Sequence, residues 1–578
     1  MPITCYEDNK GFVLENFNKG DFDYIDAASE AEECEFFRFI EAKNYLSEFS
    51  KLYPSPRTKE EVETWFYIAS RISMPLHGVQ SYNAYPYVIR SGGMLNAFGF
   101  EVGHKAKHPK TNDTTLSCKG FNNKNDYDRQ TPCDQDYLRK FSKDTDVEKL
   151  FHWFNHDIAN IFKNHKVFEK DGIFIGDGTY IFVPDNEKYE GSVRLLFDSS
   201  GHPISQETFK NMLPEKAAQC EWKRCYKLVS LLYTNKERTF NLRVALRVVP
   251  GNEHECPIFY KLLEDFIENI GDGVVNRLIL DRGFIDGERI SWFKRKHGVD
   301  ILIPLKKNMD LYKDVMGLID SNNISIDFKE YMASERISID QPRLKSVDVP
   351  ERIRKRELKR QKTVLEKKEK SQQISPPDPA KVIVKSEVAG ISNFTTWNSC
   401  TVPVNLIINR DTYASGETKI WILLDTKPFD GVNAPIERRE EYAIRVEIEE
   451  GHRQLKCFWD LTKFTSRAFT LIVNQIIFVV LTYNLLQIWL KNRNKPKDSN
   501  EKEGQTETRK TRPRLLNQLL PTQAVIIIYY KNYYAMLAAL EYTELLLNLS
   551  EQARRKVLEK TQRLRKTLET ELELVRPA

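Results

Sequence analysis

The sequence lacks the features that would mark a secreted or strongly charged protein. Its nine cysteines are scattered through 578 residues, which argues against a disulfide framework and favours a reducing compartment. The net charge is only +5, so any surface that binds nucleic acid must be local. The first residues show no basic stretch followed by an apolar core, so we expect no secretory signal peptide. The length leaves room for roughly two to four domains with a sizeable core.

One apolar run, residues 469–490, is long enough to suggest a membrane span. Four amide side chains interrupt it: Asn474, Gln475, Asn484 and Gln487. The run is also flanked by charged sequence. We therefore predict a buried helix that covers a sheet, although hydropathy alone leaves the membrane alternative open.

A possible zinc set consists of Cys220, Cys225, His254 and Cys256. Its first two cysteines are separated by four residues and lie near a strand-like run. Packing of these thiols as small hydrophobic side chains is the favoured alternative.

Two acidic residues lie where a sheet would bring them to a common site. Asp177 lies within residues 172–183, whose β-branched and aromatic side chains predict a buried strand. Asp281 directly follows an apolar run and precedes Gly283, which predicts the carboxyl end of a strand. Open α/β sheets place their chemistry at such ends. The alternatives are a turn at the first Asp and a helix cap at the second.

A third group of polar residues follows a helical pattern. Tyr442, Arg445, Glu449 and Lys456 lie at offsets of 0, 3, 7 and 14. At about 100° per residue these offsets fall within roughly 60° of one another. One helix face would then present an aromatic hydroxyl, two cations and a carboxylate, which suits phosphate oxygens and a divalent metal. A solvated charged face is the alternative.

The ordered set of two Asp residues and one Glu resembles the DDE transposases of bacterial and archaeal insertion sequences, specifically the insertion sequence four family. That family's signature is Tyr, two residues, Arg, three residues, Glu, six residues and Lys, and this chain matches it without a gap from Tyr442 to Lys456. GDGTYIF around Asp177, LILDRGF around Asp281 and VVPGNEHE at 248–255 resemble further family segments.

The resemblance covers roughly residues 170–490, and two positions depart from the family pattern. Val446 stands where an aromatic residue usually follows the Arg, and Gly451-His452 replaces the common residues before Arg453. Neither departure changes an expected metal ligand. They put fine substrate contacts in doubt rather than the chemistry.

The resemblance implies an Mg-dependent transposase that binds insertion-sequence ends, cleaves DNA and transfers the strand to a target. Crowded carboxylates repel one another unless a divalent cation neutralises them, so two Mg²⁺ or Mn²⁺ ions are expected. The implied catalytic and metal-binding residues are Asp177, Asp281 and Glu449. The implied DNA-binding residues are Tyr442, Arg445, Arg453 and Lys456.

The implied partner is double-stranded DNA, as terminal inverted repeats and as target, held by a homodimer in a synaptic complex without a membrane. The expected location is the cytoplasm of a prokaryote, at the nucleoid. Two alternatives remain: a catalytically silent DNA-binding descendant that regulates transposition, and a structure-specific nuclease that does not join ends to a target.

We predict an α/β fold with a ribonuclease H-like mixed-sheet core, a β-rich insertion, and helical N- and C-terminal regions. The expected divisions are 1–165, mainly helical and DNA-binding; 166–320, the first part of the core; 321–435, the insertion with a basic helix; 436–495, the second part with the Glu helix; and 496–578, a basic linker and C-terminal helices.

Three segments outside the core also suggest roles. Residues 137–165 predict two helices joined by a polar turn, compatible with helix-turn-helix recognition of DNA or with simple packing. Residues 351–370 hold ten basic and four acidic residues, which suits phosphate binding or a solvated helix. Trp397 and Trp421 could stack on a displaced base or belong to the core. Residues 523–549 predict a helix.

Overall fold

The computed structural model describes most of the chain. It covers residues 7–559 apart from 29–30, 61, 86–103, 108–113, 118–132, 237–239, 321–325, 332–381, 458, 494–524 and 532. The predicted basic helix at 351–370 therefore lies outside the described residues.

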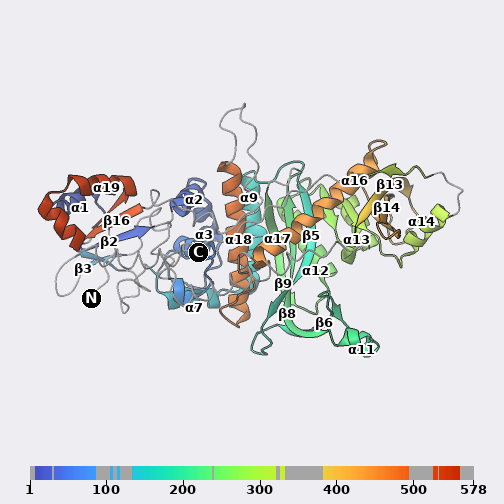
Figure 1. Cartoon of the computed structure of the whole chain (residues 1–578), viewed down its shortest axis with the longest axis horizontal. Coiled ribbons are helices and arrows are strands. Elements are labelled where there is room, and N and C mark those ends of the chain that lie inside the picture. Colours follow the sequence, from blue (N-terminus) through green and yellow to red (C-terminus); the bar gives the residue numbers. More distant parts are fainter. Residues whose placement is uncertain are drawn as a thin grey trace.

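An eleven-stranded mixed sheet lies in the right-hand half of the molecule in Figure 1. Its strand order is β12-β13-β14-β15-β11-β10-β5-β8-β6-β7, and β9 also pairs with β8. The strands are β5 (Ile173–Val183), β6 (Val193–Phe197), β7 (Pro203–Ile204), β8 (Glu221–Thr234), β9 (Asn241–Pro250), β10 (Arg277–Leu280), β11 (Asp300–Pro304), β12 (Lys329–Glu330), β13 (Ile383–Phe394), β14 (Val404–Tyr413) and β15 (Thr418–Asp425). With helices packed against this sheet, the α/β prediction is confirmed.

Within the described part of this large sheet, parallel pairing joins three neighbouring strands. β10 pairs in parallel with both β5 and β11, and the other pairs of this sheet are antiparallel. The crossovers between parallel strands are α12 (Glu255–Ile270) and α13 (Gly287–His297). Parallel strands need such helical crossovers. The last pair between β5 and β10 joins Gly176 to Leu280, so the residues after this pair lie at the end of the parallel ladder.

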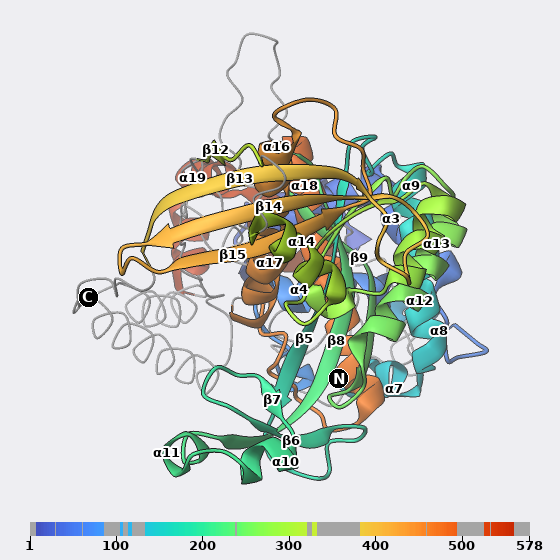
Figure 2. The ribbon, with the colours of Figure 1, turned by 90° about the vertical axis from the view of Figure 1, so that its right-hand side faces the viewer.

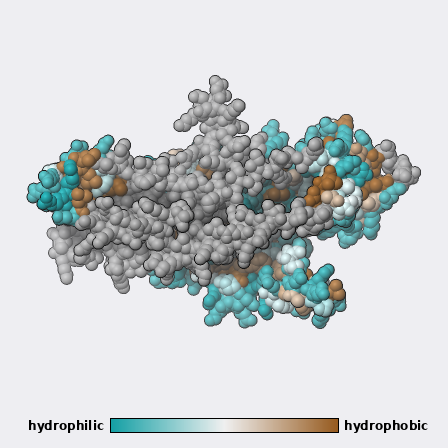
Figure 3. Space-filling model, in the orientation of Figure 1, coloured by the Kyte–Doolittle hydropathy of each residue, from teal (hydrophilic) through white to brown (hydrophobic). Residues whose placement is uncertain are grey.

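The β-rich segment after α14 (Asp310–Asp320) continues the same sheet rather than forming a separate one. β15 pairs with β11 in antiparallel fashion, and β14 and β13 follow outward. Figure 2 shows these three long strands side by side above β5 and β8. Hydrophobic atoms gather on the surface at this end (Figure 3), where exposed apolar residues include Ile383, Val384 and Val432.

The apolar helix α18 (Phe469–Arg493) is buried inside the fold. It is long and apolar enough to cross a bilayer, yet 89% of its apolar window is buried. Its amide side chains explain why, because they cover the free edge of β9. Asn484 accepts from the Arg243 N–H at 2.9 Å and donates to the Arg243 carbonyl at 2.7 Å. Gln487 accepts from the Asn241 N–H. Covering an edge strand in this way satisfies backbone groups that would otherwise be unpaired. The prediction of a buried core helix is confirmed.

The N-terminal helices share one hydrophobic core with the sheet. They are α2 (Ala31–Ala42), α3 (Tyr45–Leu52), α4 (Thr64–Leu76), α7 (Gln135–Asp144), α8 (Val147–His152), a π-helical turn η3 (Trp153–Ile158) and α9 (Ala159–Asn164). α7 and the continuous α8–η3–α9 helix are the two helices expected within 137–165, and Asp146 caps the second through the Lys149 N–H. Trp153, at the centre of the second helix, is fully buried. This helix therefore supports the core, and its role in DNA recognition stays a prediction.

A second, smaller sheet joins both ends of the described chain (Figure 1). Its strand order is β1 (Glu7–Asp8), β17 (Tyr533–Ala538), β16 (Val525–Tyr530) and β2 (Tyr24–Ala28). α1 (Lys10–Phe17) and α19 (Ala539–Asn548) pack on it. The helix predicted over 523–549 is therefore wrong for its first half. The β-branched and aromatic run VIIIYY favours an extended chain, and Lys531, at φ 55°, forms the tight turn between the strands.

A buried ion network ties the parallel strands to the segment that carries the third predicted acid. Arg277 at the start of β10 binds Asp425 at 2.6 and 3.0 Å and Glu441 at 2.9 and 2.7 Å. Arg438 binds the same Asp425 at 2.7 Å. Asp425 is fully buried, so its negative charge depends on these two arginines for compensation.

Replacing Arg277 with Met should lower the free energy of unfolding by about 3–5 kcal/mol, because it leaves the buried Asp425 short of a partner. The shift of the urea unfolding midpoint measures this effect. Arg57→Met, which removes a more exposed pair with Asp144, should change the free energy of unfolding by less than about 1 kcal/mol. Equal shifts in the two variants would contradict the assigned importance of the network.

Candidate active site

Asp177 and Asp281 lie side by side at the end of the parallel ladder. Each follows directly on the last paired residues, Gly176 of β5 and Leu280 of β10. Adjacent strands are about 4.8 Å apart, so the two acids occupy neighbouring positions. Neither alternative interpretation holds: Asp177 lies inside a continuous strand, and the Asp281 side chain caps no helix.

Glu449 lies on a helical segment that differs from the expected continuous helix. α16 (Ala434–Tyr442) ends at Tyr442, a 3-10 turn η5 (Ala443–Arg445) follows, and α17 (Val446–Cys457) carries Glu449 and Lys456. The expectation of a single regular helix face from 442 to 456 is therefore wrong. The turn changes the angular relation between the residues before and after it.

Arg445 links the second Asp to the Glu. Its guanidinium lies 2.6 Å from Glu449 Oε1 and 3.7 Å from Asp281 Oδ2. A cation thus lies between two of the predicted metal ligands. The oxygens of Asp177, Asp281 and Glu449 do not all lie within 4.8 Å of one another; among the described residues, a group that meets this measure is found elsewhere, on η3.

Asp177 is buried among cationic and imidazole groups of α17 and β9. Burial raises the pKa of its carboxyl group, while Arg445, the Gly178 N–H, Arg243 and Lys456 oppose this rise. His452 Nε2 lies 3.6 Å from Asp177 Oδ2. Positive charge stabilises the ionised form of a buried carboxylate. A divalent metal ion bound to Asp177 would supply such charge.

His452 has a defined tautomer in this site. Arg243 Nη2 lies 3.0 Å from His452 Nδ1, and guanidinium can only donate, so Nδ1 accepts and Nε2 carries the hydrogen that faces Asp177. Burial, Arg243, Lys456 and Arg445 hold the pKa of His452 well below its usual value. The imidazole is therefore neutral, and its Nε2–H faces Asp177 Oδ2 at 3.6 Å, beyond hydrogen-bond distance.

Gly451 explains the departure from the family pattern at 451–452. A Cβ at this position would lie 3.1 Å from both terminal nitrogens of Arg243. Glycine lets the fully buried guanidinium pack against α17 and reach His452. The sequence showed the departures at Gly451 and His452, but it gave no signal that Arg243 packs against them.

Lys456 and Tyr442 lie at the same site, and Arg453 pairs with an acid of its own helix. Lys456 Nζ donates to Thr179 Oγ1 at 2.6 Å, two residues beyond Asp177. The Tyr442 ring lies 6.1 Å from that of Trp421, and burial raises its pKa to about 12. Arg453 instead binds Glu450 of its own helix at 2.7 Å.

The two candidate stacking residues have different surroundings. Trp421 donates from Nε1 to Asp411 at 2.7 Å, so its indole is fixed beside Tyr442. Trp397 is partly buried against the main core. Trp421 is thus the one that borders the site.

Glu255 is a fourth acid at the site that sequence inspection did not select. It begins α12, and a Cβ at Gly178 would lie 2.2 Å from its Oε2, while a Cβ at Gly283 would lie 3.5 Å from its Oε1. These glycines follow Asp177 and Asp281, so the carboxylate of Glu255 lies beside the end of the parallel β5–β10 ladder. Burial raises its pKa, Lys227 opposes this rise, and Asp177 and Asp281 add to it.

A signal for Glu255 was present in the sequence. It ends the segment VVPGNEHE, which resembles a family segment, but nothing local indicates that the start of α12 meets the ends of β5 and β10. The proposed zinc set near it is not supported. Cys225 and Cys256 are buried, and burial raises the pKa of each thiol to about 11.

The chain matches one protein-family model. This model, described as the transposase DDE domain, matches residues 189–485, just over half of the chain. No curated protein matches the chain in sequence. Among solved structures, the piggyBac transposase synaptic complex with hairpin DNA is 9% identical, with 77% of this chain and 68% of that chain covered and a TM-score of 0.30.

Proposed function

Because the chain belongs to the family of transposases with a DDE domain, we propose that it cleaves DNA at the ends of an insertion sequence and transfers the strand to a target. The observation that carries this proposal is the register of β5 and β10, which places Asp177 and Asp281 side by side. We further assign the chain to the insertion sequence four family on its Tyr-Arg-Glu-Lys spacing.

Asp177, Asp281 and Glu449 would hold Mg²⁺ or Mn²⁺, with two ions in the site. The donor set fits, because these are hard oxygen ligands and Arg445 already lies as a cation between two of them. When bound, such ions activate the attacking hydroxyl and stabilise the departing oxygen of an in-line displacement. β9, β8, β5, β10 and β11 would form the ribonuclease H-like core that presents these ligands.

The remaining residues of the site would orient the ligands and hold the DNA backbone. Arg445, once released from Glu449, is placed to bind a phosphate beside the acids, and Lys456 is placed to bind another near Thr179. His452 faces Asp177. We propose that Tyr442 contacts the strand by its hydroxyl, and that Arg453 would have to leave Glu450 to bind DNA.

Glu255 would act with the three acids as a fourth carboxylate. Its position beside the end of the β5–β10 ladder allows it to bind an ion directly or through water. Lys227 Nζ, at 3.8 Å, opposes the rise in the Glu255 pKa that burial causes.

The test of this function is cleavage and joining of DNA by the purified chain. DNA that carries the element's terminal inverted repeats should be cut in Mg²⁺ or Mn²⁺ and not in chelator, and its 3′ ends should then join a target. Cleavage without joining would identify a nuclease instead. Binding without cleavage would identify a silent regulator. We expect a homodimer in the synaptic complex, at the nucleoid of a prokaryote.

Lys456 gives the DNA affinity a specific pH dependence. Burial, together with Arg243, lowers its pKa to about 8, so the ammonium is charged below that pH and loses its proton above it. Affinity for end DNA should therefore fall as the pH rises from about 7 to about 9, by roughly threefold to tenfold more in the wild type than in Lys456→Arg. Fluorescence anisotropy of labelled DNA measures both profiles. Parallel profiles would contradict a phosphate contact by Lys456.

A further inference from the structure

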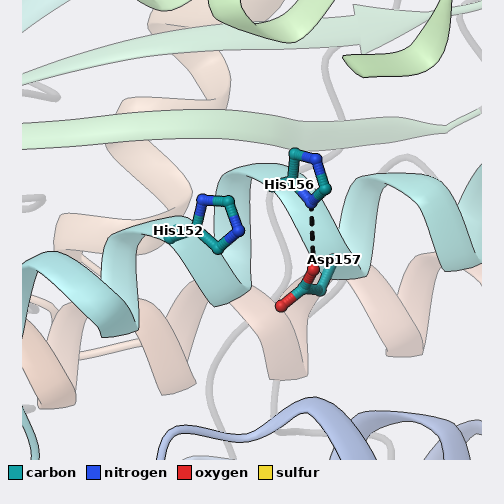
Figure 4. A group of neighbouring side chains, drawn as sticks. All are labelled: His152, His156 and Asp157. Carbon is teal, nitrogen blue, oxygen red and sulfur yellow. Dashed lines mark hydrogen bonds and ion pairs between the residues drawn. The ribbon is translucent and has the colours of Figure 1, made fainter.

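A histidine cluster lies on the helix α8–η3–α9. The ligand atoms of His152, His156 and Asp157 all lie within 4.8 Å of one another. The two imidazole rings stack with centroids 4.4 Å apart and planes 18° apart, and His156 Nδ1 lies 2.9 Å from Asp157 Oδ1 (Figure 4). By comparison, His77, His165, His202 and His297 each form an ion pair with an acidic residue.

The π-helical turn η3 brings these side chains together. In a regular α-helix His156 lies above His152, but Asp157 is displaced by about 140° around the axis. The i to i+5 closure of a π turn places Asp157 close above His152 as well. π turns occur mainly as single-turn insertions, and they are frequent at functional sites.

Contacts with the core fix the backbone of this turn. Asn155 pairs with both backbone groups of Leu246, accepting at 2.8 Å and donating at 3.0 Å. Asn269 of α12 donates to the His156 carbonyl at 2.9 Å. The turn is therefore held in the folded chain before any ligand arrives, which lowers the entropy lost on binding.

An open cavity of about 600 Å³ lies against the cluster. His152 and His156 line one side, and Asp265, Glu268 and Asn269 of α12 line the other. The cavity supplies space for water and further oxygen ligands around an ion. It also lies between the supporting helix and the crossover α12, whose first residue is Glu255.

We propose that His152, His156 and Asp157 bind a divalent transition-metal ion of the zinc class. Imidazole nitrogens favour such ions over Mg²⁺, and structural and catalytic zinc sites use nitrogen ligands at about 2.0–2.1 Å. Small side-chain rotations bring atoms within 4.8 Å to the roughly 3–4 Å separation that such bonds require. Asp157 either ligates the ion or holds His156 Nδ1 so that Nε2 ligates it. This site is distinct from the acids at β5 and β10, and it does not depend on the proposed reaction.

Zn²⁺ titration of the full, untagged chain by calorimetry tests the proposal. Saturating Mg²⁺ is present throughout, to occupy the acids at β5 and β10. The variants are His152→Ala and His156→Ala, each with an exposed or half-exposed imidazole, so that folding is retained. His202→Ala is the matched control, because His202 is exposed and lies 3.8 Å from Asp198 four residues away.

Wild type and His202→Ala should bind one Zn²⁺ at micromolar or lower Kd, and the two cluster variants should weaken this binding by about 10–100-fold per ligand. Co²⁺ should give a visible ligand-field absorption in the same two proteins only. Zn²⁺ should also raise the Tm of wild type but not of His156→Ala. A wild-type Kd above about 100 µM, or unchanged Zn²⁺ binding in His152→Ala and His156→Ala, would overturn the proposal.

Discussion

Asp281→Asn should lower the rate of metal-dependent cleavage of end-bearing DNA by more than about 100-fold. The amide keeps the size of the carboxylate but removes the charge that a divalent ion requires at the end of β10. Asp281 is part-exposed and its side chain caps no helix, so the substitution should leave the fold intact. Initial rates of nicking in Mg²⁺ measure the effect.

The control for this substitution is Asp310→Asn. Asp310 is 92% exposed and its side chain pairs only with Lys313 in the same helical turn, so its loss should leave the rate within about twofold. Asp177→Asn should match Asp281→Asn. A full-rate Asp281→Asn enzyme would refute the proposed active site, whatever its DNA affinity.

Glu255→Gln should weaken Mn²⁺ binding and slow cleavage, each by about 10-fold to 100-fold. The physical reason is the loss of a negative charge next to Asp177 and Asp281, where the charge favours a divalent ion. Mn²⁺ affinity by electron paramagnetic resonance and the cleavage rate in Mn²⁺ should change together, because one cause acts on both.

Glu253→Gln is a matched control two residues away. The Glu253 side chain is exposed, and the contact that this residue makes with Lys227 uses its carbonyl oxygen, which the substitution keeps. If Asp281→Asn is inactive and Glu255→Gln behaves like Glu253→Gln, the fourth-carboxylate role alone is refuted. If neither Asp281→Asn nor Glu255→Gln has an effect, the proposed function fails as well.

Short-range patterns in the sequence identified the two strands that carry the Asp residues. The β-branched and aromatic run at 172–183 predicted β5, and the apolar run before Asp281 predicted β10, because strand periodicity is a local property. The apolar run at 469–490 was assigned to the interior on its four amides, and two of them, Asn484 and Gln487, pair with β9.

Features that depend on non-local pairing were missed or misassigned. The segment VIIIYYKNYYAMLA was taken as helix, but it forms two strands that pair with each other and, on their outer edges, with β2 and β1 near the other end of the chain. An apolar run of this length has no local marker for its partner, so the choice between helix and strand is made by the tertiary contacts. The 3-10 turn before Val446 was also missed. There Arg445 pairs with Asp281, a residue far away in the sequence.

The sequence by itself determined the chemical composition of the site: two Asp residues after apolar runs, and a Glu in a Tyr-Arg-Glu-Lys spacing typical of one transposase family. Only the tertiary structure decided that β5 and β10 pair in a register that aligns Asp177 with Asp281. It also decided that Glu255 lies beside the end of the β5–β10 ladder, that His452 faces Asp177, and that a π turn gathers His152, His156 and Asp157. These are contacts between segments far apart in the chain or set by a rare helical turn, and their geometry follows from packing rather than from local periodicity.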